Sequence, residues 1–275
     1  MFQEISKFEP NIKQFCKYHL AYHNSARPLG IEKGAVVTAD LAEVLPEFNV
    51  RQYFSTQPNI FVDYDHLVTA YDSGSGKAIG LLGARWLGSA ECRFLYLWTA
   101  MIGDSHRNSM LFNRIVAYFF EKVAMHCADG ALPELIVTKT YNPVVYSIFK
   151  SYALASGATI DVYPIVPAAA QDEEMVELAK RIATAISPKL VLQTETGVVP
   201  GGQAMVAPDF FPRMEESKDA DVNRHFQTHL TRSDQVLCIL RIDDRMRKNA
   251  LQLVASRKHA APAVADRATS AALPA

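Results

Sequence analysis

The sequence lacks several features that would assign it to a familiar class. Its four cysteines are far apart in 275 residues and form no CxxC pair, so we expect neither a disulfide scaffold nor a cysteine-rich zinc site. Basic and acidic residues nearly balance, at 28 and 29, which argues against a broad nucleic-acid-binding face. No run approaches the roughly 18 apolar residues that a membrane span needs. The first stretch, MFQEISKFEP, is charged and has no apolar signal core. We therefore expect a cytoplasmic protein that binds neither nucleic acid nor membrane.

The composition is that of a folded globular protein. Apolar residues make up 49% of the chain and charged residues 21%, which suits a domain with a large hydrophobic core. The length allows one large domain or two smaller ones. The segment from His259 to Ala275 is rich in alanine and has few large apolar side chains, so we expect a mobile tail there.

Helical signals follow from Pro10 onward. Pro10 precedes apolar residues at helical spacing and predicts a helix that ends before Pro28. Asp40 and Glu43 have the spacing of a capping box, and they predict a second, short helix that Pro46 ends.

From residue 66 onward, strand patterns alternate with helical ones. We expect, in order, a hairpin of strands 66–71 and 78–87, a strand at 93–102, a long amphipathic helix at 108–127, a strand at 133–138, a helix from 142 to 153 and a strand at 158–163. After Pro167 the pattern predicts a helix at 172–186, a loop-rich stretch at 190–212, a short helix at 221–230, a buried strand at 234–242 and a basic helix at 245–256.

Two stretches in this series resemble the GNAT superfamily of N-acetyltransferases. The first is Ile102–Phe112, IGDSHRNSMLF, where family members end the central strand and place an Arg/Gln-x-x-Gly-x-Gly/Ala loop at the start of a long helix. The second is Val137–Ala153, VTKTYNPVVYSIFKSYA, which follows the family pattern Asn-x-x-Ala-x-x-Leu-Tyr in register at Asn142. The resemblance covers about 60% of the chain, judged from these motifs and from the element order of residues 1–164.

The resemblance implies an α/β (α+β) fold, with a mixed, mostly antiparallel sheet flanked by helices and a large insertion or extension in the C-terminal half. The family sheet adds its seventh strand soon after the sixth, and the best candidate here is the distant strand 234–242. We therefore expect an acyltransferase core at 1–164, an insertion or small lobe at 165–233, a returning strand and helix at 234–257 that complete the core, and a disordered tail at 258–275.

The resemblance also implies the activity: transfer of an acyl group from acyl-CoA, with acetyl-CoA the expected donor, to the amine of a small molecule. Amides at the start of the long helix would hold the pyrophosphate, as helix N-termini hold anions. The strands near Trp98 and Val137 would separate to admit the pantetheine. The implied donor-binding residues are Met101, Ile102, Arg107, Asn108, Ser109, Met110, Leu111, Phe112, Asn142 and Phe149.

The chain departs from the family pattern at the chemical positions. Met110 and Phe112 stand where the family has glycines, and their side chains would crowd a pyrophosphate. Phe149 stands where many members have a tyrosine that acts as general acid, so Tyr146 and Tyr152, one helical step to either side, are the substitute candidates. For the base that accepts the proton of the amine, the candidates are Glu91 and His106. The ordinary roles of these two are a solvated charge at a hairpin end and a polar residue beside a helix.

Several alternatives remain open. An acyl carrier protein would bring its phosphopantetheine without the nucleotide that needs the glycine loop, and it is a second candidate donor and partner. A non-catalytic GNAT-like module that binds a ligand or partner is another alternative, and a different α/β enzyme with its site in the glycine-rich loop Gly197–Gly202 is a third. A homodimer is compatible with all of them. The histidine pairs His19/His23 and His225/His229 have helical spacing, and Cys16 near the first pair is a third potential ligand. Neither pair has the adjacent glutamate of the zinc-protease motif or a complete four-ligand set, so we expect no metal.

Overall fold

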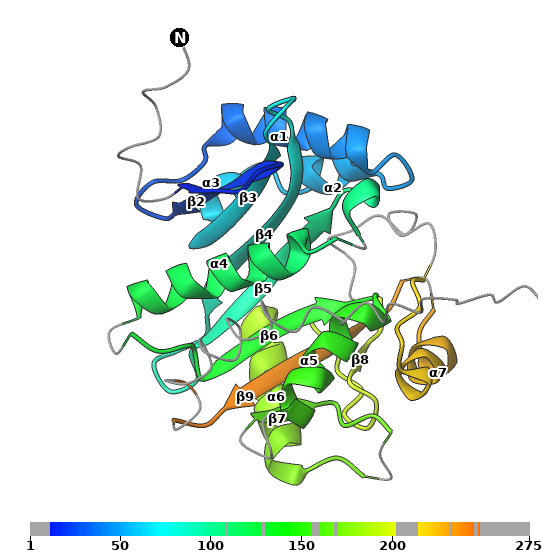
Figure 1. Cartoon of the computed structure of the whole chain (residues 1–275). Coiled ribbons are helices and arrows are strands. Elements are labelled where there is room, and N and C mark those ends of the chain that lie inside the picture. Colours follow the sequence, from blue (N-terminus) through cyan, green and yellow to red (C-terminus); the bar gives the residue numbers. More distant parts are fainter. Residues whose placement is uncertain are drawn as a thin grey trace, which may run out of the picture.

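A single mixed sheet organises the molecule (Figure 1). The computed structural model describes residues 12–107, 109–127, 130–155, 160–167, 170–201, 214–231, 233–244 and 247. In this part of the chain the strands follow the order β1-β2-β3-β4-β5-β6-β9-β7, with β8 also paired to β9. Neighbouring strands are antiparallel except β5 and β6, which are parallel. The strands are β1 (Ile12–Gln14), β2 (Tyr18–Asn24), β3 (His66–Asp72), β4 (Ala78–Leu87), β5 (Phe94–Ile102), β6 (Leu135–Thr140), β7 (Ile160–Tyr163), β8 (Val198–Val199) and β9 (Gln235–Ile242).

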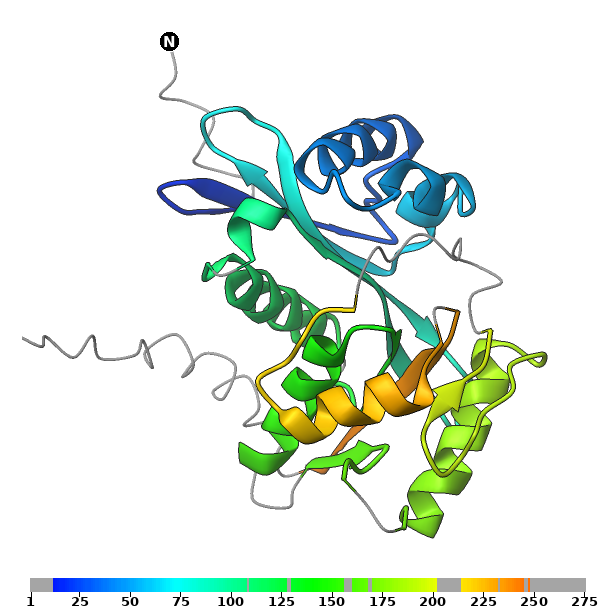
Figure 2. The same ribbon diagram turned by 90° about the vertical axis from the view of Figure 1, so that its right-hand side faces the viewer.

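Helices cover both faces of the sheet (Figure 2). The helices are α1 (Ile31–Val44), α2 (Val50–Ser55), α3 (Ile60–Asp63), α4 (Leu111–His126), α5 (Pro143–Ala155), α6 (Glu173–Ile186) and α7 (Ala220–His229), with a short 3-10 helix, η1 (Asp104–His106). The first face carries α4, α5 and α7, whose buried side chains share one cluster with the strands. On the second face, α1 to α3 cover the N-terminal strands and α6 covers the C-terminal ones, in two further clusters. The predicted fold class is thereby confirmed.

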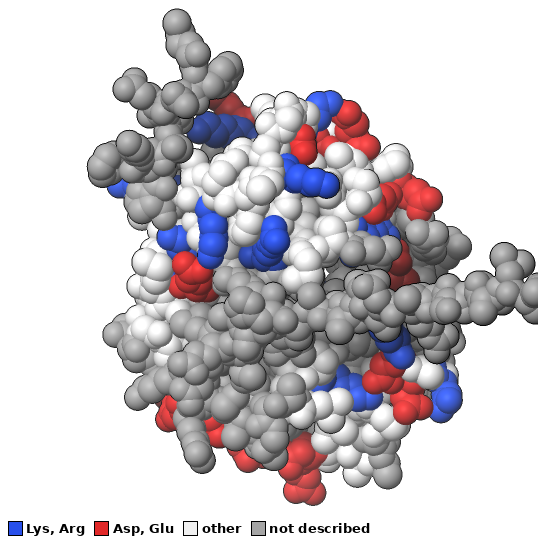
Figure 3. Space-filling view, viewed as in Figure 1, with Lys and Arg blue, Asp and Glu red and all other residues white. Residues whose placement is uncertain are grey.

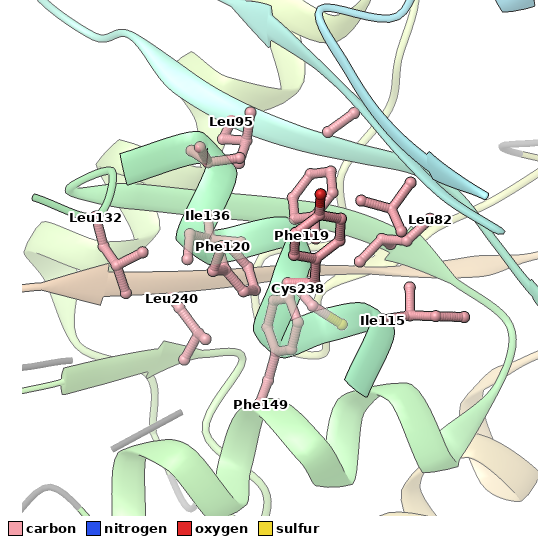
Figure 4. Close-up of a cluster of buried hydrophobic side chains, with 14 of the residues drawn as sticks. Leu82, Leu95, Ile115, Phe119, Phe120, Leu132, Ile136, Phe149, Cys238 and Leu240 are labelled. Atoms are coloured by element: carbon pink, nitrogen blue, oxygen red, sulfur yellow. The ribbon is translucent and has the colours of Figure 1, made fainter. Parts of the chain in front are cut away.

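The core of the first face is built around aromatic side chains of α4 (Figure 4). Phe119 is fully buried and Phe120 almost so, and their rings meet edge to face with centroids 5.3 Å apart. Phe149 extends from α5 toward Cys238 of β9. Packing of this kind is what the apolar stripe of the long helix predicted.

The late strand β9 lies between β6 and β7. It pairs with β6 from Leu135–Arg241 to Thr140–Val236, and with β7 from Ile160–Ile242 to Tyr163–Ile239. In the sequence, the elements α6, β8 and α7 therefore lie between β7 and β9, which are neighbours in the sheet. The division of the chain into a core and an insertion at 165–233 stays a prediction, and the tail from 258 and nearly all of the basic helix at 245–256 lie outside the described residues.

Two predictions about the N-terminal region were wrong. Residues 12–24 form strands β1 and β2 and not a helix. The reason is a period of two, because Tyr18, Leu20 and Tyr22 are buried in alternation with less buried residues. Asp40 caps no helix, since it lies inside α1, where its carboxylate accepts the backbone N–H of Ala78 at 3.0 Å.

Charged side chains are spread over the surface. On the face seen in Figure 3, basic and acidic side chains of the described residues are interspersed among uncharged ones. None of the helices in the described ranges combines the length and the apolar character that a membrane crossing requires.

Candidate functional site

Strands β5 and β6 separate toward their carboxyl ends (Figure 1). They are paired only at Leu95–Ile136 and Tyr96–Val137, whereas β4 and β5 are paired at eight positions. Beyond Tyr96, the hydroxyl of Thr138 donates to the carbonyl of Leu97 at 3.0 Å. We call the stretch between 97–102 of β5 and 138–140 of β6 the β5–β6 opening. The separation that the resemblance implied is thus present.

A β-bulge marks the start of this opening. Between β4 and β5 the register shifts, so that Gly83 faces Thr99 and Ala84 faces Leu97, which leaves Trp98 as the extra residue of β5. Bulges turn a side chain and interrupt pairing, and they are frequent beside active sites. At Thr99, the residue after the bulge, the hydroxyls of Tyr53 and Tyr64 each lie 2.7 Å from the threonine hydroxyl. This buried network fixes α2 and the segment after α3 against the bulged strand.

The carboxyl end of β5 leads through η1 into α4. The Ser109 hydroxyl accepts the backbone N–H of Leu111 at 3.1 Å and donates to the carbonyl of His106 at 2.7 Å. The amides of Phe112 and Asn113 follow in the first turn of α4, where an α-helix has no intrahelical partners for its N–H groups. The positive end of the α4 dipole therefore lies at the carboxyl end of β5.

Among the other predicted loop residues, Met110 is 42% exposed and Leu111 is fully buried in the first-face core. Met101 is buried in the cluster with α1 to α3, and Ile102 packs against the α4 cluster. Asn108 lies outside the described residues. The structure thus brings the described residues of the predicted donor loop together at one corner of the β5–β6 opening.

Arg107 is held by two carboxylates. Its guanidinium contacts Asp104 at 2.8 Å and also pairs with Glu215 from the segment before α7. It lies over the ring of Phe48, with 5.2 Å from Cζ to the ring centroid. The guanidinium charge is therefore already compensated, and its visible role is to join η1 to the segment before α7.

The second predicted stretch is mostly structural. The Asn142 side chain accepts the backbone N–H of Val144 at 2.8 Å, which confirms it as the cap of α5. Tyr146 is fully buried, its hydroxyl donates to the carbonyl of Pro164, and burial raises its pKa far above the ordinary value. Phe149 is buried in the core, and Tyr152 is half-buried one turn further along α5.

The two candidate bases lie in different places. His106 is half-buried in η1, beside the donor loop. Glu91 is exposed in the turn before β5, at the opposite end of that strand. It lines a groove of about 640 Å³ together with Lys180 and Arg181 of α6. The structure therefore does not bring Glu91 together with the loop residues.

Three side chains on the second face of the sheet were not among the predicted site residues, although the resemblance implied that the strands separate near Trp98. Arg85 alternates with Ala84 and Trp86, which belong to the first-face core, so Arg85 points to the second face. Trp98 packs against the α1–α3 cluster and the α6 cluster at once. Lys139 follows two positions after Val137 of the α6 cluster and shares its face.

These three residues flank the β5–β6 opening. The Arg85 guanidinium lies over the Trp98 ring, 4.9 Å from Cζ to the centroid. Lys139 is half-buried, and burial lowers the pKa of its ammonium. No local signal identifies them, because the bulge and the separation of the strands arise from pairing between distant segments.

No protein-family model and no curated protein sequence matches this chain. Solved structures do match. A GNAT family N-acetyltransferase from Escherichia coli in complex with CoA is 13% identical over 50% of this chain and 69% of its own, with a TM-score of 0.36. A putative GNAT-family acetyltransferase from Bordetella pertussis is 11% identical over 58% and 93%, with a TM-score of 0.36. A diaminobutyrate acetyltransferase from Paenibacillus lautus, bound to its substrate and coenzyme A, is 16% identical over 52% and 80%, with a TM-score of 0.30.

Proposed function

We propose that this protein is an N-acyltransferase that moves an acyl group from acyl-CoA, with acetyl-CoA as the expected donor, to an amine. The observation that carries the proposal is the β5–β6 opening, where two adjacent parallel strands part and lead into α4 and α5. Backbone N–H and C=O groups in such a gap need partners. An extended chain with amide groups, such as pantetheine, supplies them in the way that an added strand does.

The nucleotide end of the donor would bind at the start of α4. The amides of Phe112 and Asn113 and the helix dipole favour a pyrophosphate there. Because Arg107 is already paired with two carboxylates, the backbone would provide most of the attraction. Met110 precedes these amides in the sequence and is exposed.

The reaction joins the amine nitrogen to the thioester carbonyl carbon and breaks the carbon–sulfur bond. An amide of β5 within the opening would stabilise the tetrahedral oxyanion, since preorganised N–H groups act most strongly away from water. The amine proton passes to a base, and the departing thiolate takes up a proton. Lys139 suits the role of base, because it borders the opening and burial lowers its pKa. Tyr152 remains the candidate for the acid, since the Tyr146 hydroxyl is bonded inside the core.

The proposal is tested by calorimetric titration with acetyl-CoA and CoA. Phe112→Pro removes one amide in the first turn of α4, where the N–H groups have no intrahelical acceptor, and Phe112→Ala is the matched control that keeps the amide. We expect donor affinity to fall about tenfold in the proline variant relative to the alanine variant, which is the effect of one charge-assisted hydrogen bond. Equal affinities would contradict a pyrophosphate at this position.

An acyl carrier protein is the second candidate donor, and two features of the donor loop favour it. The compensated Arg107 and the exposed Met110 leave the loop poorly suited to a highly charged nucleotide. Acyl transfer from a carrier-bound phosphopantetheine, without binding of free CoA, would identify this donor. If neither donor binds at millimolar concentration, the acyltransferase proposal is wrong, and a non-catalytic ligand-binding module becomes the better account.

A further inference from the structure

Arg85 differs from the other half-buried arginines of the described chain. Arg107 and Arg241 each pair with two carboxylates, Arg114 donates to the hydroxyl of Tyr18, and Arg247 pairs with Asp244. Arg85 is half-buried too. In the described part of the chain its contact is the face of Trp98, with neither a carboxylate nor a hydrogen-bond acceptor beside it.

A guanidinium in this setting can still bind a ligand. Stacking on an indole uses the flat face of the group and leaves its N–H edge free. That edge carries five donors in a planar fork, which matches the two oxygens of a carboxylate. A cation withdrawn from water without an acceptor is costly, so a carboxylate brought by a ligand would restore the lost hydrogen bonds.

The position of Arg85 connects it to the proposed reaction. Arg85 is paired with Tyr96, the last residue of β5 that is paired with β6. Trp98, on which it stacks, is the bulged residue at the start of the β5–β6 opening. A ligand carboxylate on Arg85 would therefore lie about one to two strand spacings, roughly 5–10 Å, from the centre of the opening.

The charge and chemistry of the second face are consistent with such a ligand. Lys139, the proposed base, lies on the same face at the other side of β5, where it can receive a proton from the amine of a ligand whose carboxylate is on Arg85. The Trp98 ring is part of an apolar surface continuous with the α1–α3 and α6 clusters. The site thus combines basic groups with one aromatic surface, on the face opposite α4 and α5.

We propose that Arg85 and Trp98 form the recognition site for the acceptor, and that the acceptor is a small amine carrying a carboxylate, of the amino-acid class. Arg85 binds the carboxylate, Trp98 contacts the apolar part, and the amine reaches the β5–β6 opening. This inference rests on the proposed acyltransferase function and specifies its substrate class.

The test measures kcat/KM for acetyl transfer to the L-α-amino acids and 4-aminobutyrate, each compared with its own amide. We expect at least one acid to exceed its amide by tenfold or more. Arg85→Gln should abolish this preference by lowering kcat/KM for the acid about tenfold while that for the amide stays the same. Arg85→Lys should keep part of the preference, because an ammonium retains the charge but not the planar fork.

A matched control is available on the same hairpin. Arg93 lies over the ring of Trp86, 4.6 Å from Cζ to the centroid, and Trp86 packs in the first-face core. Arg93→Gln removes an equivalent cation–π contact away from the proposed site and should leave the preference for acids unchanged. Calorimetry with acetyl-CoA on each variant checks that donor binding is unaffected.

The outcomes separate the two proposals. If acetyl-CoA or a carrier donor binds and amines are acetylated, but amides are used as well as acids or Arg85→Gln lowers both equally, the carboxylate site is wrong and the acyltransferase function stands. If no donor binds, the acyltransferase function is wrong and the acceptor site falls with it. Thermal unfolding of each variant checks its stability separately. If Arg85→Gln is destabilised, Arg85→Lys decides in its place, and a preference for acids equal to that of the wild type would contradict recognition by the planar fork.

Discussion

A buried histidine makes the stability of this fold dependent on pH. His66 of β3 is only 3% exposed. Its Nε2 accepts the indole N–H of Trp86 at 3.1 Å, and its Nδ1 lies 2.7 Å from the hydroxyl of Tyr22. Because the indole nitrogen can only donate, Nε2 carries no proton and Nδ1 carries one. Protonation of Nε2 would place its N–H opposite the indole N–H of Trp86, with no acceptor between the two donors.

The cost of that protonation can be worked out. Burial, then the nearby His126, then Arg93 lower the pKa of His66 from 6.5 to about 4. His66 therefore binds a proton near pH 6.5 in the unfolded chain but only near pH 4 in the folded chain. Stability that is fully present above pH 6.5 is lost as the pH falls, by about 2 kcal/mol at pH 5 and about 3 kcal/mol at pH 4. That loss is a large part of a typical folding free energy of about 5–15 kcal/mol.

The assay is urea unfolding, followed by far-UV circular dichroism, at intervals between pH 4 and 8. His66→Gln is the comparison, because its amide can accept from Trp86 and donate to Tyr22 without titrating. Other groups that titrate in this range contribute alike to both proteins and cancel in the difference. The measured quantity is the wild-type free energy of unfolding minus that of His66→Gln. Between pH 8 and pH 4 we expect this difference to fall by about 3 kcal/mol. Parallel curves for the two proteins would refute this account of His66.

Three further predictions follow from the site. Lys139→Arg replaces the candidate base with a group that stays protonated and cannot accept a proton. We therefore expect kcat to fall at least tenfold, with no recovery up to pH 9, and KM to change little. An unchanged pH–rate profile would exclude Lys139 as the base. Gly83→Ala should lower stability by about 1–3 kcal/mol in thermal unfolding, because the added Cβ would lie 2.4 Å from the Tyr64 ring; an unchanged melting temperature would contradict the close packing. Glu215→Gln removes one of the two carboxylates that compensate Arg107 and should strengthen CoA binding and its dependence on salt; weaker binding would show that Glu215 positions the loop and does not compete with the donor.

Local patterns predicted much of the fold. The hairpin β3–β4, the long helix α4 and the strand β9 were found within a few residues, because each has a strong period or a clear turn. Strand β2 was missed, since its alternating residues coincide with helical spacing when Phe15 and Cys16 are included. Burial decided in favour of the strand, and burial depends on pairing with β3.

The candidate site was less accessible from the sequence. The described residues of the predicted donor loop are close in the sequence and lie together at the start of α4, but the pairing of Arg107 with Glu215 joins residues 108 positions apart. The opening between β5 and β6 depends on which residues pair, and the bulge at Trp98 depends on the register with β4. Neither property belongs to a single segment, so no periodicity or spacing within one segment predicts it.

The hairpin β4–β5 shows why residue types alone could not assign the site. It carries two arginine–tryptophan pairs, Arg85 with Trp98 and Arg93 with Trp86, on opposite faces. On the first face, the Trp86 indole is bonded to His66 and helps to close the core. On the second face, Trp98 lies in a bulge beside two strands that part. The same pair of residue types therefore stabilises the fold in one place and forms a candidate recognition site in the other. The difference is that the second pair lies where the neighbouring strands β5 and β6 separate.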